Sequence, residues 1–238
     1  MKKLIDYINQ ITGNEPADEL IRRFEDYYEM LVEKNKVMNL TAITEKDEVI
    51  LKHFIDSLAI AEVYPGIKQK KQKVLDLGTG AGFPGIPLKL VFPQLDMTLF
   101  DSLNKRILFL QDVIGALDLK DCIAVHGRAE EAARKKEMRE QYDLVVSRAV
   151  AALPVLAEYC IPFVKPGGYF ISYKTADVNE ELSSAKHALE VLGGRAERVE
   201  KLVLPGSDIG RSFVIVKKEK PTGKAYPRKA GTAGRQPL

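Results

Sequence analysis

Val74-Leu75-Asp76-Leu77-Gly78-Thr79-Gly80-Ala81-Gly82-Phe83-Pro84-Gly85 is the most informative stretch of this chain. An apolar run typical of a buried strand leads into four glycines within eight positions, and Pro84 marks the start of a helix. Glycine lets the backbone approach a ligand closely, and the free N–H groups at a helix N-terminus bind anions. The stretch therefore predicts a ligand-binding loop, for either a nucleotide pyrophosphate or the carboxylate of an amino-acid ligand.

Two cofactor classes compete for this loop. Residues 80–85 satisfy the dinucleotide pattern G-x-G-x-x-G, which favours NAD. The glycines begin earlier, however, at Gly78, and the run Asp76-x-Gly78-x-Gly80-x-Gly82 resembles motif I of S-adenosylmethionine-dependent methyltransferases. Asp101 lies 25 residues beyond Asp76 and can accept hydrogen bonds from both ribose hydroxyls of either cofactor, so it does not discriminate. We interpret Asp76, Gly78, Gly80, Gly82 and Asp101 as ligands of S-adenosylmethionine.

The surrounding chain alternates short β-rich runs with helical patterns, which predicts an α/β fold with a parallel sheet. Two further runs lack room for a helix between them and should form an antiparallel hairpin. The whole predicts a class I methyltransferase sheet (Rossmann-like) with a C-terminal hairpin and an N-terminal helical extension. The predicted strands are Lys73–Leu77, Met97–Phe100, Cys122–Val125, Asp143–Ser147, Gly168–Lys174, Arg198–Leu204 and Ser212–Lys217; the predicted helices between them include Lys105–Leu117, Glu130–Arg139 and Val178–Leu192.

Three parts of the chain are distinguished by composition. Residues 1–70 are expected to be helical, with one helix opening near Pro16 and another at the capping-box pattern Thr44-Glu45-Lys46-Asp47, followed by the apolar stripe Ile50, Phe54, Leu58 and Ala61. Residues 71–218 should form the cofactor-binding domain. Residues 219–238 form a basic tail, since positions 217–238 hold seven basic residues and one acid. Such a tail suits a polyanion partner or merely keeps the chain soluble.

The bulk composition indicates a cytoplasmic globular protein. Hydrophobic residues make up 45% and charged residues 29% of the 238 positions. The apolar stretch at 149–164 is shorter than the roughly 20 residues that cross a bilayer, and the first residues do not resemble a signal peptide. Cys122 and Cys160 are too far apart for a zinc pair and look like core residues, so no metal site is expected.

The residues after the fourth strand, Ser147-Arg148-Ala149-Val150, should face the methyl acceptor. The Asn/Asp-Pro-Pro-aromatic motif of enzymes that methylate exocyclic amines is absent there, and neither cysteine is placed as the nucleophile of a cytosine-C5 enzyme. These absences favour an acceptor that is already nucleophilic, such as the N7 of guanine, because its lone pair is free and no base has to remove a proton.

Several blocks together resemble one family, the bacterial 16S ribosomal RNA guanine-N7 methyltransferases, also called glucose-inhibited division protein B. The blocks are Asn39–Ile43, His53–Leu58, Gly78–Gly85, Gly127–Glu130, Ser147–Ala149 and Tyr226–Thr232. The resemblance implies in-line methyl transfer from S-adenosylmethionine to 16S ribosomal RNA, either naked or within the small ribosomal subunit, by a monomer. An NAD-dependent oxidoreductase and a non-catalytic RNA-binding protein on the same fold remain the alternatives.

The resemblance also implies roles for single residues. Gly78 and Phe83 would contact the cofactor, and Ala129 and Glu130 would flank its adenine. Arg148 would lie beside the site as a cofactor-binding and positioning residue. Glu130 also suits the first turn of a helix, and Arg148 a structural ion pair. His53, Asp56 and Ser57 suit either an interdomain hydrogen-bond network or RNA contact. The residues predicted to bind RNA are Lys174, Arg211, Lys224, Arg228, Lys229 and Arg235.

Overall fold

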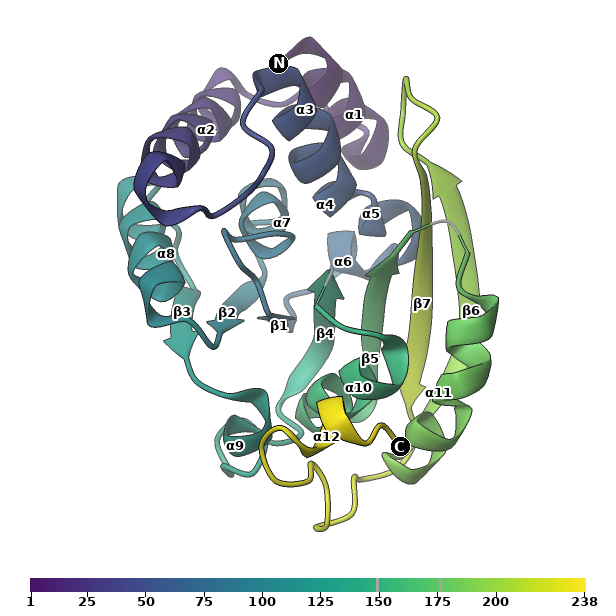
Figure 1. The fold of residues 1–238 in the computed structure, drawn as a ribbon. Helices are drawn as coiled ribbons and strands as arrows, with labels where there is room; N and C mark the ends of the chain where they lie inside the picture. The colour runs from purple at the N-terminus through teal and green to yellow at the C-terminus, as the bar shows by residue number, and fades with distance from the viewer. Residues whose placement is uncertain (149, 176) are drawn as a thin grey trace.

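A computed structural model describes residues 1–238 except Ala149 and Ala176. Its strands form one sheet in the order β3-β2-β1-β4-β5-β7-β6 (Figure 1). Strands β1 to β5 are parallel, whereas β7 runs antiparallel to both β5 and β6. This arrangement confirms the predicted parallel sheet with a C-terminal hairpin. The strands are β1 (Lys73–Leu77), β2 (Asp96–Asp101), β3 (Cys122–His126), β4 (Tyr142–Arg148), β5 (Val164–Lys174), β6 (Gly194–Val203) and β7 (Gly210–Lys218).

Helices cover both faces of this sheet. The first group precedes it: α1 (Lys2–Thr12), α2 (Asp18–Met38), α3 (Lys46–Val49), a π-helical turn (Ile50–Ile55), α4 (Asp56–Leu58), α5 (Ile60–Val63) and α6 (Gly66–Gln69). The second group lies between or after the strands: α7 (Gly85–Val91), α8 (Asn104–Ala116), α9 (Ala129–Ala132), α10 (Leu153–Cys160), a 3-10 turn (Ile161–Phe163), α11 (Asn179–Val191) and α12 (Thr232–Arg235). None of the helices in the described part of the chain is long and apolar enough to span a bilayer.

Successive side chains along a β-strand point to opposite faces of the sheet, so alternating strand residues pack into two hydrophobic cores, one on each face. Val74 and Leu144 point into the core that also holds residues of α1, α2, α7 and α8. Their neighbours Leu75 and Val145 point into the opposite core, with α10 and α11. The helical extension therefore shares a continuous core with the sheet, and its position relative to the strand ends is fixed by packing.

Two helix predictions need correction. The first helix of the capping-box region begins at Lys46, and its cap is Glu45, whose side chain accepts a hydrogen bond from the Glu48 N–H at 2.9 Å, so the predicted cap at Thr44 is one residue early. The predicted stripe Ile50, Phe54, Leu58 and Ala61 is confirmed, because all four residues are buried.

The helix predicted at Glu130–Arg139 is wrong beyond its first turn, since α9 ends at Ala132 and turns follow. Long-range hydrogen bonds explain the early end. Arg139 donates to the carbonyl oxygens of Thr222 at 2.6 Å and Tyr226 at 2.9 Å, and Arg134 donates to that of Pro227. These arginines hold the C-terminal segment, a tertiary demand that overrides local helix propensity.

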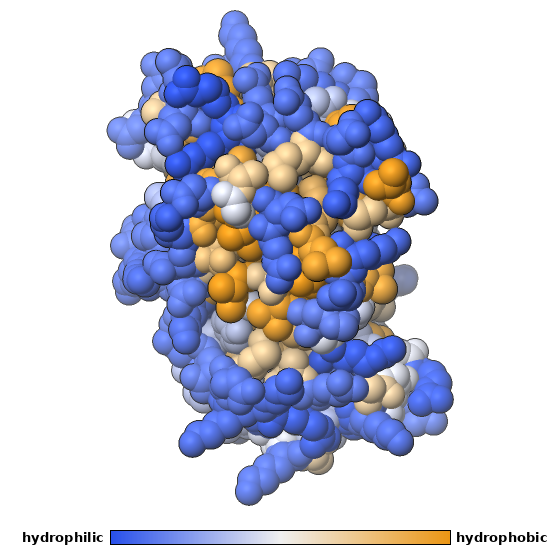
Figure 2. Space-filling view, turned by 90° about the vertical axis from the view of Figure 1, so that its left-hand side faces the viewer, coloured by the Kyte–Doolittle hydropathy of each residue, from blue (hydrophilic) through white to orange (hydrophobic). Residues whose placement is uncertain are grey.

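From β1 the chain builds the sheet outward in one direction through β2 and β3, and from β4 it builds outward in the other direction through β5. The crevice at the carboxyl ends of β1 and β4, where this switch occurs, is the expected ligand site. Figure 2 shows the side of the molecule that carries α2 and α8, with hydrophobic side chains gathered between polar regions above and below. The exposed large hydrophobic residues include Leu103, which directly precedes α8, Leu108 within α8, and Ile123 on the edge strand β3. This side is therefore less polar in its middle than at its rims.

Candidate active site

The glycine loop leaves β1 and bends over the carboxyl end of the sheet. The N–H groups of Gly78 and Thr79 both donate to the carbonyl oxygen of Phe100, at 2.8 and 3.1 Å, which ties the loop to β2. The Asp101 carboxylate accepts from the Gly80 N–H at 3.0 Å and from Arg106 at 3.1 Å. The Asp101 carboxylate thus shapes the loop, and its contact with a cofactor stays a prediction.

Asp76 lies beneath the loop and is completely buried. Its Oδ2 accepts hydrogen bonds from the Thr79 hydroxyl at 2.6 Å and the Gly85 N–H at 2.8 Å. Its Oδ1 has no hydrogen-bond partner among the residues that the structure describes. Burial raises the pKa of Asp76 to about 7, against the lowering effect of its two hydrogen bonds. Asp76 therefore supports the loop from inside, and the predicted direct contact with cofactor stays a prediction.

The raised pKa of Asp76 predicts how stability depends on pH. Because the folded-state pKa exceeds the unfolded value, the folded protein binds an extra proton between about pH 4 and 7, and stability falls as pH rises through that window. Asp76→Asn removes this titration and keeps an oxygen that accepts from Thr79 and Gly85. We expect the variant to be more stable than the parent at pH 8, by up to roughly 4 kcal/mol. Urea unfolding at pH 5 and pH 8 measures this, and an unchanged pH dependence would contradict it.

The four loop glycines have different surroundings. A Cβ on Gly80, where φ is +62°, would meet nothing within 4 Å, so the loop opens onto free space there. A Cβ on Gly82 would lie 2.7 Å from the Tyr27 hydroxyl, and one on Gly85 would lie 2.2 Å from Leu99. A Cβ on Gly78 would lie 2.4 Å from the Val150 side chain. Packing alone thus accounts for Gly82 and Gly85, while a side chain at Gly80 would extend into open space.

A cavity of about 190 Å³, here called the Asp101 cavity, lies beside this loop. Four of the predicted cofactor residues line it: Gly78, Asp101, Ala129 and Glu130. Phe100, Tyr159 and Gly231 complete much of its wall. The backbone of a strand end, a carboxylate that can accept hydrogen bonds and an aromatic ring meet in one cleft, and this combination suits the ribose and base of a nucleoside. The residues present therefore fit the adenosine half of S-adenosylmethionine.

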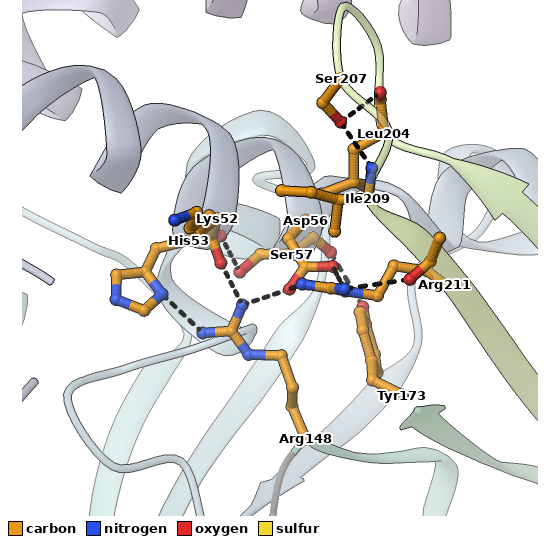
Figure 3. A network of polar contacts seen from close by, with 11 residues as sticks. Lys52, His53, Asp56, Ser57, Arg148, Tyr173, Leu204, Ser207, Ile209 and Arg211 are labelled. Atoms are coloured by element: carbon orange, nitrogen blue, oxygen red, sulfur yellow. Dashed lines mark hydrogen bonds and ion pairs between the residues drawn. The ribbon is translucent and has the colours of Figure 1, made fainter. Parts of the chain in front are cut away.

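Arg148 occupies the junction between the loop and the helical extension (Figure 3). Its guanidinium donates to the Asp56 carboxylate at 2.9 Å and to the Lys52 carbonyl oxygen at 3.1 Å. The guanidinium also lies 3.2 Å from His53 Nδ1. The guanidinium carbon lies 5.2 Å from the centroid of the Phe83 ring, which also stacks on His53 at 4.5 Å. One side chain therefore connects β4, the extension and the glycine loop.

Asp56 is the buried centre of this network. Besides Arg148, it accepts from the Arg211 Nε at 2.8 Å, so one carboxylate balances two guanidinium groups. Ser57 is also buried; its hydroxyl donates to the His53 carbonyl oxygen, and its own carbonyl oxygen accepts from the Tyr173 hydroxyl at 2.8 Å. Of the two roles weighed for His53, Asp56 and Ser57, the structure shows the hydrogen-bond network between extension and sheet (Figure 3), and RNA contact stays a prediction.

A second cavity of about 480 Å³, here called the Asp56 cavity, opens over this network. Its lining carries Lys52, Arg148, Lys174 and Arg211 as cations, with Asp56 and Glu181 as the acids and His53 beside them. Burial, followed by the charge of Arg148, lowers the pKa of His53 to about 4, so its ring is neutral at physiological pH. The cavity therefore has a net positive lining, which attracts an anionic ligand.

A family model described as rRNA small subunit methyltransferase G (GidB) matches residues 20–209. The chain belongs to this family. The Ribosomal RNA small subunit methyltransferase G of Lachnoclostridium phytofermentans is 55% identical over 92% of this chain and 89% of its own length. The protein of the same name from Clostridium novyi is 47% identical over 100% of this chain and 98% of its own. These relatives confirm the family resemblance that the sequence blocks indicated.

Solved structures confirm the fold at much lower identity. Methanococcus jannaschii TYW2 in complex with AdoMet has a TM-score of 0.51 and 17% identity, covering 68% of this chain and 75% of that chain. The fibrillarin pre-rRNA processing protein of the same organism has a TM-score of 0.50 and 22% identity, covering 65% of this chain and 69% of that chain. The chain thus combines methyltransferase G family membership with a class I methyltransferase sheet.

The residues predicted to bind RNA divide into two groups. Lys174 and Arg211 line the Asp56 cavity and are ion-paired, with Glu181 at 2.6 Å and Asp56 at 2.8 Å. The other four belong to the C-terminal segment. Lys224 and Lys229 are exposed, Arg235 donates to the Gly231 carbonyl oxygen at 3.1 Å, and Arg228 pairs with buried Glu158 at 2.6 Å. RNA contact stays a prediction for all six.

Several residues of the site were not predicted from the sequence. Tyr27 donates to the Ala81 carbonyl oxygen at 2.7 Å and so braces the glycine loop from α2, and Arg106 holds Asp101. Gly231 lines the Asp101 cavity although it lies in the C-terminal segment. Of the residues that should face the acceptor, Ala149 lies outside the described part. No local pattern marks Tyr27, which contacts a residue 54 positions away. Arg106 lies only five positions from Asp101 but had no predicted role. Gly231 lies in the family block Tyr226–Thr232, but its contact with Glu130, 101 positions away, could not be seen in the sequence.

The two cysteines behave as the sequence indicated. Cys122 and Cys160 are both buried, and burial raises the pKa of Cys122 to about 12 and that of Cys160 well above its ordinary value. A thiol with so high a pKa is a poor nucleophile. In the part of the chain that the structure describes, no group of three or more His, Cys, Asp or Glu side chains is placed to hold a metal ion.

Proposed function

We propose that this protein transfers the methyl group of S-adenosylmethionine to N7 of a guanine in 16S ribosomal RNA. The observation that carries the proposal is the junction at Arg148. That residue touches Phe83 of the glycine loop on one side and lines the positively charged Asp56 cavity on the other. A donor held in the loop and an acceptor held in the cavity would meet there. The relatives' printed name supports a small-subunit ribosomal RNA substrate.

The residues that would hold S-adenosylmethionine come from three strand ends. Asp101 would take the ribose hydroxyls, Ala129 and Glu130 would flank the adenine, and the free space at Gly80 would take the methionine part. When bound, the cofactor supplies an electrophilic methyl group on a positively charged sulfur. The protein would contribute alignment, which is worth up to roughly 7–11 kcal/mol when two reactants are held near attack geometry.

The acceptor side is built for positioning and not for proton removal. Guanine N7 carries a free lone pair, so its methylation releases no proton. His53 is neutral and engaged with Arg148 and Thr41, and Asp56 is held by two arginines. Lys52, Lys174 and Arg211 would attract the phosphates that flank the target base, which RNA presents most easily in a loop or bulge. This supports reaction by direct in-line transfer, with no metal ion required.

The most informative experiment is transfer of a labelled methyl group to ribosomal RNA, with mapping of the labelled nucleotide. Naked 16S RNA and assembled small subunits are tested side by side, since either is a candidate substrate in the bacterial cytoplasm. Label at a single guanine N7 is the expected result. Titration with S-adenosylmethionine and NAD tests the cofactor separately. Binding of NAD alone, or RNA binding without methyl transfer, would overturn the proposal.

The proposed chemistry predicts a flat pH profile. Enzymes that need a general base lose rate as pH falls through that base's pKa, whereas His53, with a pKa of about 4, stays neutral throughout. We expect the single-turnover rate at saturating S-adenosylmethionine to be constant between about pH 6 and 8.5, the range in which an ordinary histidine titrates. Rates measured across that range for the parent and His53→Gln check this.

Asp76 provides the control for this profile, because its pKa of about 7 lies inside the same range. A change in rate near neutral pH that disappears in Asp76→Asn would show that titration of the loop affects the rate; the flat profile would then be wrong, although no general base would be implied. If instead the rate falls toward low pH in the parent and this fall disappears in His53→Gln, the histidine removes a proton during the reaction. An acceptor atom that bears a proton would then fit better than guanine N7.

A further inference from the structure

The C-terminal segment is folded onto the body of the protein, although its composition suggested a solvated basic tail. Figure 1 shows it, in yellow, passing α9 and α10 at the lower edge of the molecule. Its first anchor is Thr222, which is buried: its N–H donates to Glu140 at 2.6 Å and its hydroxyl donates to the Leu192 carbonyl oxygen at 2.7 Å. Arg139 and Arg134 then bind the carbonyl oxygens of Thr222, Tyr226 and Pro227.

The strongest anchor is the pair of Arg228 with Glu158 of α10. The Glu158 side chain is only 1% exposed. Its carboxylate accepts the Arg228 backbone N–H at 2.6 Å and is met by the guanidinium Nη2 at 2.6 Å and by Nε at 3.0 Å. Bidentate pairs of this kind fix orientation as well as charge. Arg228 thereby holds the segment in register on α10, beside Tyr159.

Three residues beyond this anchor, the segment reaches the Asp101 cavity. The Gly231 N–H donates to Glu130 Oε1 at 2.8 Å, and Gly231 lines the cavity together with Glu130 and Tyr159. Glu130 is itself buried. The lining of the Asp101 cavity is therefore built partly from the C-terminal segment, and the Arg228–Glu158 pair sets where Gly231 lies in it.

We propose that Gly231 forms part of the wall of the S-adenosylmethionine site and that Arg228 is a positioning residue for cofactor binding, and not a phosphate contact. This inference rests on the proposed cofactor function of the Asp101 cavity. Loss of the anchor would release Gly231 from Glu130 and open the cavity on that side. By reciprocity, bound S-adenosylmethionine should hold the segment down as strongly as the segment aids binding.

The experiment compares two adjacent cations of the same segment. Arg228→Met breaks the buried pair, whereas Lys229→Met removes an equal charge from an exposed side chain. Because Arg228→Met leaves Glu158 buried without its partner, the double variant Glu158→Gln/Arg228→Met removes both charges and guards against unfolding. Calorimetric titration with S-adenosylmethionine, below the unfolding temperature of each variant, should show binding weakened about tenfold or more in both Arg228 variants and unchanged in Lys229→Met.

A second measurement separates a binding role from a stabilising one. Tryptic cleavage after Lys229 should be slowed by S-adenosylmethionine in the parent protein and not in the Arg228 variants, whereas a purely stabilising residue would change the unfolding temperature alone. Unchanged affinity in the folded Arg228 variants, or weaker RNA binding without weaker cofactor binding, would overturn this inference while the proposed function stands. A parent protein that binds no S-adenosylmethionine would overturn the proposed function itself.

Discussion

Replacing Gly80 with valine should abolish binding of S-adenosylmethionine while the sheet stays folded. A Cβ at this position meets no protein atom within 4 Å, so the added methyl groups would extend into the space that the loop leaves for its ligand. We expect affinity to fall by more than about a hundredfold, equivalent to about 2.8 kcal/mol. Titration calorimetry with the purified variant measures it.

Backbone strain has to be separated from this steric effect, because Gly80 has a φ of +62° and valine adopts such values poorly. Gly167 offers a matched control, since its φ is +87°, nothing lies within 4 Å of its Cβ position, and it is exposed near the amino end of β5, away from the loop. Gly167→Val should lose comparable stability and keep its affinity. Equal affinity in folded Gly80→Val would exclude the glycine loop as the cofactor site.

Sequence patterns predicted the site where the determinants are local. The strand, glycine run and following carboxylate occupy neighbouring positions in the chain, and the sheet brings Asp76, Gly80 and Asp101 together as expected. The short β-rich runs likewise predicted the strands, and six of the seven predicted strands lie wholly within observed ones. The roles of Arg148 and of the helix that carries His53 were predicted from the family blocks. Such blocks indicate that residues are functionally important, but they do not show that Arg148 and His53 are in contact.

What could not be predicted depends on pairs far apart in the chain. Arg228 and Glu158 are 70 positions apart, and each alone resembles an ordinary surface charge. The early end of α9 likewise depends on Arg139 meeting Thr222, 83 positions away. Gly82 belongs to a cofactor-like pattern, yet its missing side chain makes room for Tyr27. In each case a tertiary contact decides the role, and no window of sequence contains both partners.

Replacing Arg148 with methionine should produce the largest loss of methyl-transfer rate among variants that keep the cofactor cavity intact. Methionine preserves much of the side-chain volume but removes the donors to Asp56, to the Lys52 carbonyl oxygen and to His53. It also removes the cation from the face of Phe83. The loop and the Asp56 cavity would then be free to shift relative to one another. Because a misplacement of about 1 Å can cost roughly a hundredfold in rate, we expect a fall of that order or more in the single-turnover rate.

The design of this test separates positioning from folding. Asp56 keeps Arg211 at 2.8 Å in the variant, so its buried charge is not left alone, and Arg195→Met, which breaks an exposed ion pair with Glu219, is the matched control. Arg148→Lys retains the charge but cannot reach three acceptors at once, so it should recover little rate. S-adenosylmethionine affinity should change far less than the rate, because Arg148 does not line the Asp101 cavity. A rate equal to that of Arg195→Met, in a folded variant that binds both substrates, would show that the junction at Arg148 does not align donor and acceptor.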